Sequence, residues 1–77
     1  MDRLKQIIEQ ETGTPVTKLT PNFDLIQEGG LDSLDTMTVL MEIENTFEID
    51  IDDKVYQNVR TYGDLEAMVQ GLIDEKF

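Results

Sequence analysis

Apolar residues recur at helical spacing in several stretches of this chain, and their pattern predicts an all-α fold. The first stretch predicts an amphipathic helix over residues 3–12, which Gly13 and Pro15 end as a stop signal. Between Pro15 and Leu31 the periodicity lapses, so a long loop is expected there. Such a loop must be held by its own apolar side chains or have a function; those side chains are Val16, Leu19, Phe23, Leu25 and Ile26.

A second helix is predicted to begin at Asp32-Ser33-Leu34-Asp35 and to run to about Phe47. Asp32 can accept hydrogen bonds from the free amides of the first turn, and Asp35 adds negative charge beside the positive end of the helix dipole. The pattern predicts a buried stripe of Leu40, Ile43 and Phe47.

A neighbouring line on this helix ends in two carboxylates, and unpaired buried charge is costly, so the line is not expected to be buried along its length. Its members are Leu34, Met37, Met41, Glu44 and Glu48. The first three form either an exposed apolar strip or a wider core contact, and the sequence leaves both open.

The segment after Phe47 alternates like a strand, but the chain offers no partner strand, so an extended turn held by Ile49 and Ile51 is expected. A short helix over Asp53–Val59 and a final helix after Thr61 follow. Thr61 and Asp64 have capping-box spacing, and the apolar positions behind them are Leu65, Met68, Val69, Leu72 and Ile73. The prediction is one domain, residues 1–77, built as a bundle of three main helices and one short helix.

Composition excludes much chemistry. The 77 residues contain no cysteine and no histidine, which rules out disulfides, thiolate or imidazole metal sites and Ser/His or Cys/His catalysis. The acidic run at Asp50 lacks the glycine of a calcium loop, and no phosphate-binding glycine loop is present. An enzyme is therefore not expected. Without a membrane-spanning run or a signal peptide, the expected compartment is the cytoplasm, with no membrane insertion.

The net charge of −11 is concentrated in the middle of the chain. Ten acids and no base lie between Lys18 and Lys54. Such a field repels nucleic acid and attracts basic protein surfaces, although a solvated acidic face that serves only solubility is the plainer interpretation.

Ser33 lies at the junction of the long loop and the second helix, inside this acidic region. A serine near a helix start is most often structural. It also lacks a base that could make it a nucleophile in its own right. An accessible hydroxyl at such a corner, beside a possible apolar strip, suits a modification acceptor whose activating groups come from another protein.

The segment from Gly29 to Ile51 resembles the phosphopantetheine attachment region of acyl carrier proteins, whose motif is Asp-Ser-Leu at the head of the second helix. The likeness extends over the first helix, the long loop with Phe-Asp-Leu, the acidic second helix and the opening of the last helix. It implies that Ser33 carries 4′-phosphopantetheine, transferred from coenzyme A by a phosphopantetheinyl transferase. Acyl groups would travel on the thiol of this arm.

The resemblance also implies a recognition surface for the transferase and for acyl- or aminoacyl-handling enzymes with basic docking surfaces. The positions are Asp32, Leu34, Asp35, Met37, Met41 and Glu44, with Glu42 and Glu48 adding charge. A monomer is expected.

Some features differ from carriers of fatty acid synthesis. Thr38 and Asn45 stand where many of those carriers have acids, and the approach Asp-Leu-Ile-Gln-Glu-Gly-Gly-Leu-Asp-Ser-Leu is longer than usual. The longer approach is similar to carriers of specialised pathways and to D-alanyl carrier proteins. A dedicated carrier is therefore preferred, with fatty-acid or lipid synthesis, an aminoacyl carrier, and a non-carrier acidic interaction module as alternatives.

Overall fold

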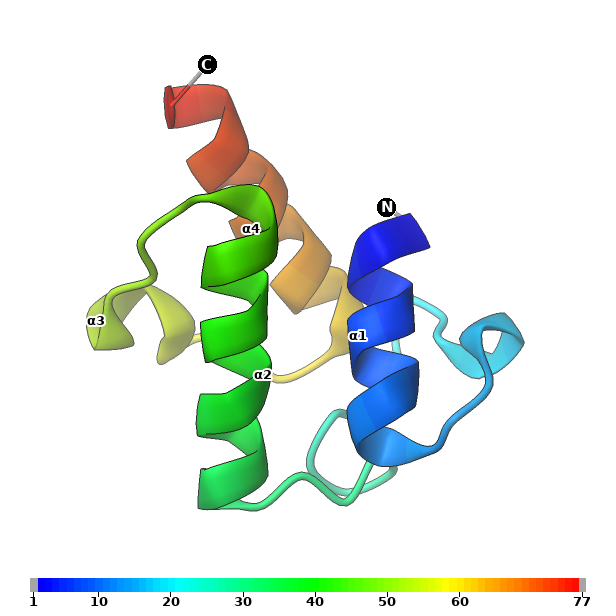
Figure 1. The fold of residues 1–77 in the computed structure, drawn as a ribbon. Helices are drawn as coiled ribbons and strands as arrows, with labels where there is room; N and C mark the ends of the chain where they lie inside the picture. The colour runs from blue at the N-terminus through cyan, green and yellow to red at the C-terminus, as the bar shows by residue number, and fades with distance from the viewer. Residues whose placement is uncertain (1, 77) are drawn as a thin grey trace.

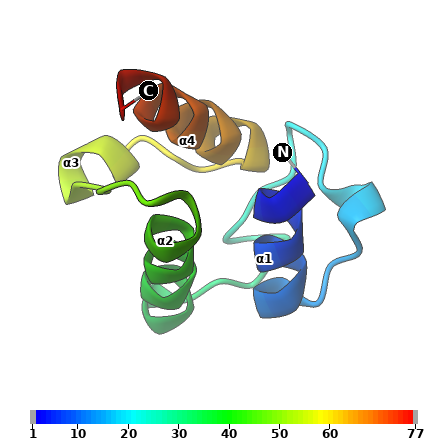
Figure 2. The same cartoon turned by 45° about the horizontal axis from the view of Figure 1, so that its top comes forward.

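The first two long helices lie side by side and run in opposite directions, while the last helix packs across them (Figures 1 and 2). The computed structural model describes residues 2–76. Within this range it has four α-helices and no named strand, which confirms the predicted all-α fold. The elements are α1 (Asp2–Thr12), a 3₁₀ turn η1 (Val16–Lys18), α2 (Ser33–Phe47), α3 (Asp53–Tyr56) and α4 (Tyr62–Lys76).

The core forms where α1, α2, α4 and the long loop meet. The expected apolar positions of α1 are all buried, as are Leu65 and Val69 of α4. Six side chains have less than 2 % of their surface exposed: Leu4, Ile8, Leu25, Ile43, Leu65 and Val69. Because they come from three helices and the loop, burying them fixes how the helices are arranged.

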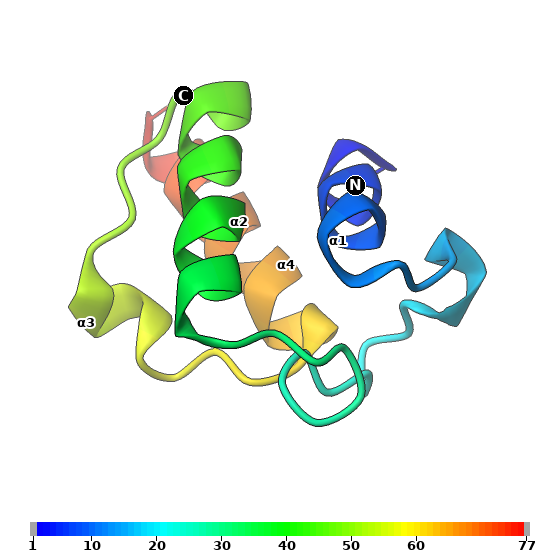
Figure 3. The same cartoon turned by 60° about the horizontal axis from the view of Figure 1, so that its bottom comes forward.

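The long loop is held by four buried side chains. Leu19, Phe23 and Leu25 are buried, as the sequence predicts, and Leu31 joins them. Ile26 does not, because 54 % of it is exposed to solvent. The loop passes below α1 and returns to the start of α2 (Figure 3). Of the five apolar side chains expected to hold the loop, three are therefore buried, while Val16 is half-buried and Ile26 is exposed.

The predicted buried stripe of α2 needs one correction. Ile43 is fully buried and Phe47 packs against the core, but Leu40 is only half-buried. Val39 takes the inner position, with 3 % exposed. Val39, Ile43 and Phe47 are spaced i, i+4, i+8, which keeps them on one side of a helix of 3.6 residues per turn. Leu40 lies about 100° further round and reaches only the edge of the contact.

α2 ends at a residue in the left-handed backbone conformation, and this residue is a glutamate where glycine is more usual. Glu48 has φ of 54°, and its amide donates to the Glu44 carbonyl, as does the amide of Ile49 at 3.2 Å. This C-terminal cap turns the chain so that Ile49 enters the core. The following segment is an extended turn held by Ile49 and by the half-buried Ile51, as expected.

The two C-terminal helices start where predicted. Asp52 accepts from the Lys54 amide to cap α3, which ends at Tyr56, earlier than the predicted Val59. For α4, the Thr61 hydroxyl accepts from the Asp64 amide at 3.1 Å, and the Asp64 carboxylate accepts from the Thr61 amide at 3.2 Å. This reciprocal pair is the predicted capping box.

Candidate functional site

Ser33 is exposed and is the first residue of α2, the helix that starts at its lower end in Figure 1. The preceding Asp32 has extended backbone, and its Oδ1 accepts a hydrogen bond of 2.8 Å from the Asp35 amide. The structural role expected of a serine near a helix start is therefore performed by Asp32. The Ser33 hydroxyl is left accessible on a fixed corner.

The open question about the second line of α2 is settled in favour of an exposed strip. Leu34, Met37 and Met41 are 74 %, 60 % and 59 % exposed, and we call them the apolar strip. They face away from Val39 and Ile43. Exposed large apolar side chains in a row, next to an exposed hydroxyl, are typical of a surface that another protein covers. The flexible methionines also suit a surface that meets several partners.

The predicted recognition acids differ in their surroundings. Asp32 and Glu48 are exposed, whereas Asp35 and Glu42 are half-buried along one edge of α2. Glu44 lies along the other edge, where its Oε2 accepts from the Ile51 amide at 2.8 Å. Glu44 therefore also holds the turn after α2. Glu48 lies about 22 Å from Ser33, since each of 15 helical residues adds about 1.5 Å, so the two are at opposite ends of the helix.

The ten acids of the middle segment belong to the long loop, α2, the turn that leads into α3 and the first residue of α3. The bases lie in α1, η1, α3, α4 and the α3–α4 connector, residues 57–61. The negative charge therefore extends from the loop before Ser33 along α2 to the turn at the opposite end of that helix, and Asp32 and Asp35 are the acids nearest to Ser33 in the sequence.

One basic residue, which sequence reasoning did not single out, contacts the loop before Ser33. Residues 24–32 are here called the serine loop, and Arg60 Nε lies 3.4 Å from Asp24 Oδ2. Hydrogen bonds from the Gln27 amide foremost, and from Ile26 and Arg60, hold the pKa of Asp24 below its usual value, although partial desolvation opposes them. No local pattern links Asp24 to Arg60, because 36 residues separate them.

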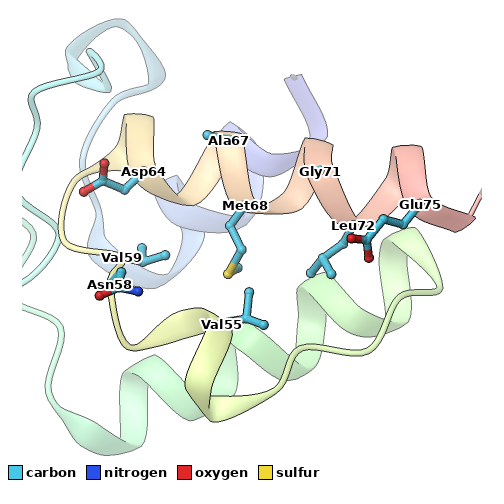
Figure 4. A pocket seen from close by; sticks show the side chains of 9 residues that line it. All are labelled: Val55, Asn58, Val59, Asp64, Ala67, Met68, Gly71, Leu72 and Glu75. Atoms are coloured by element: carbon cyan, nitrogen blue, oxygen red, sulfur yellow. The ribbon is translucent and has the colours of Figure 1, made fainter.

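A groove of about 500 Å³ runs between α3 and α4 (Figure 4). Val55 of α3 faces Met68 and Leu72 of α4 across it, and Gly71 leaves room along the helix. None of its lining residues belongs to α2 or to the serine loop. The groove is therefore separate from the Ser33 corner.

No helix within residues 2–76 is long and apolar enough to cross a membrane. In the same range, no three acids are placed to hold a metal ion.

Comparison with known proteins identifies the protein family to which this fold and the Ser33 corner belong. The family model described as "Phosphopantetheine attachment site" matches residues 2–69. The chain therefore belongs to the phosphopantetheine attachment family, the family of the acyl carrier proteins.

A solved structure from Mycobacterium tuberculosis, described as a candidate acyl carrier protein, is similar in fold. Its TM-score is 0.82 with 28 % sequence identity, and the match covers 91 % of this chain and 93 % of that one. Both comparisons confirm the resemblance read from the sequence.

The cofactor of this family is covalently attached 4′-phosphopantetheine, and the Ser33 corner fits it. Attachment needs a hydroxyl that another enzyme can reach and whose loss to esterification breaks no structural bond. Ser33 is exposed, and the capping bond nearby belongs to Asp32. When bound, the group supplies the thiol that a chain without cysteine lacks. Because the chain belongs to this family, it is a phosphopantetheine carrier, and it interacts with a phosphopantetheinyl transferase and with acyl-handling enzymes.

Proposed function

We propose that Ser33 is the attachment site, and that the chain carries acyl intermediates as thioesters on the arm for a biosynthetic pathway. The observation that supports this most is the exposed Ser33 at the start of α2, where Asp32 already caps the helix. A phosphodiester on Ser33 projects into solvent and leaves the first turn of α2 intact.

We further propose that enzymes dock on the apolar strip and the acids around it. The strip gives a partner apolar area to bury at the centre, while the acids attract a basic rim. Asp32, Asp35, Glu42, Glu44 and Glu48 supply that charge. Encounters of this kind are fast and weaken as salt is added, which suits a carrier that visits several enzymes in turn.

In this proposal residues 1–77 form a single monomeric carrier domain with no catalytic site of its own. It works in the cytoplasm, where coenzyme A supplies the arm. The long serine loop supports a dedicated pathway over fatty acid synthesis. Its extra residues fold into turns in which the amides of Glu28 and Gly29 both donate to the Asp24 carbonyl. The same feature keeps a D-alanyl or other aminoacyl carrier as the second candidate.

Intact-mass spectrometry tests the attachment. The protein is incubated with coenzyme A and a phosphopantetheinyl transferase, and Ser33→Ala serves as the matched variant. The wild type should gain the mass of one phosphopantetheine, while Ser33→Ala should gain none. An unmodified wild type would favour the acidic interaction module, and a modified Ser33→Ala would place the arm on another hydroxyl.

The cargo is tested separately with the modified protein. It is offered to adenylating enzymes that activate D-alanine or other amino acids, and to acyl-loading enzymes. Aminoacylation would select the second candidate. Fatty-acid elongation enzymes that use the protein as well as their own carrier would overturn the preference for a dedicated pathway.

A further inference from the structure

A second, smaller groove lies beside the loop that leads to Ser33. It has a volume of about 340 Å³ and separates the serine loop from the α3–α4 connector. Asp24, Ile26 and Gln27 form the loop side. The connector side is formed by Gln57, Asn58, Val59 and Arg60.

The two walls of this groove are tied together at one end. The Leu25 amide donates to the Arg60 carbonyl at 3.1 Å, and the Tyr62 amide donates to the Phe23 carbonyl at 2.8 Å. Leu25 and Tyr62 are both buried, and the Asp24–Arg60 ion pair spans the same junction. The groove is therefore a fixed feature between two anchored segments.

The chemistry of the walls matches the parts of a phosphopantetheine arm. The arm contains an anionic phosphodiester, a pair of geminal methyl groups and two amides. Arg60 is 69 % exposed, and its guanidinium has more donors than the single Nε contact to Asp24 uses. Ile26 offers exposed apolar surface to the methyl groups. The side-chain amides of Gln27, Gln57 and Asn58 can pair with the arm's amides.

The groove is also within reach of Ser33. Leu31 lies two residues before Ser33, a separation of at most about 7 Å in an extended chain. The Leu31 amide donates to the Leu25 carbonyl at 3.3 Å, and Leu25 is in turn bonded to Arg60. The phosphodiester is bonded to the Ser33 hydroxyl and stays beside it, so the Arg60 side chain has to extend toward it, while the rest of the arm, which has the length of several residues when extended, reaches the groove.

Electrostatics favour this direction over the others. A phosphodiester on Ser33 is flanked by Asp32 and Asp35, and no base occurs in the sequence between Lys18 and Lys54. Arg60 is a cation hydrogen-bonded to the serine loop itself. The arm's charge is therefore repelled along α2, whereas on the connector side Arg60 balances the charge of Asp24 and has further donors for the phosphodiester.

We propose that the phosphopantetheine arm, when no enzyme holds it, rests in the groove between the serine loop and the α3–α4 connector, with Arg60 as the positioning residue for its phosphodiester. The inference depends on attachment at Ser33. The resting position leaves the apolar strip uncovered, so an enzyme can dock on α2 while the arm is still on the adjacent side of the molecule.

The absence of cysteine makes a direct test possible. A thiol-directed nitroxide label can react only with the arm's terminal thiol, and mass spectrometry confirms one label per chain. Amide NMR signals are then compared before and after the nitroxide is reduced. A second sample carries the arm without the nitroxide and is enriched in ¹³C. Nuclear Overhauser spectroscopy on this sample measures contacts from the arm's geminal methyl groups to the methyl groups of Ile26 and Val59. We expect these contacts, together with strong signal loss for residues 24–27 and 57–60.

Charge-matched variants test the role of Arg60. Arg60→Gln should weaken the methyl contacts and the signal loss in the groove, while Arg60→Lys should retain much of both. Lys54→Gln removes the same charge from an exposed position on α3 and should change neither. Spectra of each variant without the arm show whether the serine loop keeps its fold.

The outcomes separate the two proposals. A protein that gains no arm contradicts attachment itself. A protein that gains the arm but shows its contacts at Met37 and Met41, in the α3–α4 groove, or nowhere on the surface overturns the resting position and leaves attachment intact. Equal effects of Arg60→Gln and Lys54→Gln would remove Arg60 as the positioning residue.

Discussion

Asp32 and Ser33, adjacent at the start of α2, have different roles. Asp32 makes the capping bond to the Asp35 amide, whereas Ser33 occupies the first helical position with its side chain exposed. The acid therefore stabilises the helix and the serine remains available for chemistry. Under the proposed attachment, this division lets Ser33 be modified without loss of the helix cap.

We predict opposite outcomes for the two alanine variants at this corner. Asp32→Ala should lower the free energy of unfolding by about 1 kcal/mol, because a capping acceptor is lost. Ser33→Ala should leave it nearly unchanged, since alanine is favourable inside a helix. Urea denaturation followed by circular dichroism measures both. A larger loss for Ser33→Ala than for Asp32→Ala would mean that Ser33 is itself structural.

At the scale of the element, α2 has one face for the core and one for partners. Ile43 is fully buried, while Met41, two residues earlier, is 59 % exposed.

We predict that Ile43→Ala costs about 2–5 kcal/mol of stability, since it leaves a cavity. Met41→Ala should change stability by no more than about 0.5 kcal/mol and should slow loading by the transferase. Denaturation and loading rates, measured on both variants, check the assignment; unchanged loading of Met41→Ala would count against docking on the strip.

α4 should be sensitive to acid because its capping box depends on an ionised carboxylate. Hydrogen bonds from the Thr61 amide, then the Arg60 amide, with a smaller one from the Thr61 hydroxyl, outweigh desolvation and lower the pKa of Asp64 below its usual 3.8. The unfolded chain then takes up its proton at a higher pH than the folded chain does. The stabilisation is present above the ordinary aspartate pKa and is lost as the pH falls through the lowered value.

The acid sensitivity can be measured in thermal melts between pH 6 and about pH 2.5, a range that extends below the ordinary aspartate pKa. Asp64→Asn should melt earlier than the wild type near neutral pH, and the difference should shrink in acid. A difference that stays constant with pH would show that the carboxylate charge is not what holds the box.

At the scale of the whole molecule, repulsion between acidic side chains opposes folding. Ten acids lie on the serine loop, α2, the turn after it and the start of α3, and they are closer together in the folded chain than in the unfolded one. Added salt screens this repulsion. We predict a higher melting temperature with modest NaCl, and a larger rise with MgCl₂ of the same ionic strength.

Calorimetry across a salt series measures this effect. A gain of about 1 kcal/mol corresponds to about 4–8 °C in a domain of this size. A melting temperature that magnesium leaves unchanged or lowers would contradict the charge argument.

The sequence by itself determined the elements and the place of the serine. Helical periodicity, the Asp32 cap, the Gly13 stop and the Thr61–Asp64 box are local patterns, and local hydrogen bonds decide them. The same patterns could not choose Val39 over Leu40 for the core, because both positions are apolar and only the direction of the neighbouring helices distinguishes them. Nor could they show that the apolar strip is exposed.

Only the tertiary structure decided which distant residues share the Ser33 region. Arg60 lies 36 positions from Asp24, yet the buried Leu25 and Tyr62 hold their backbones side by side. Ile26, an apolar residue like its buried neighbour Leu25, was left on the groove wall. Contacts of this kind depend on how the whole core packs, and sequence periodicity reports only which side of one element is apolar.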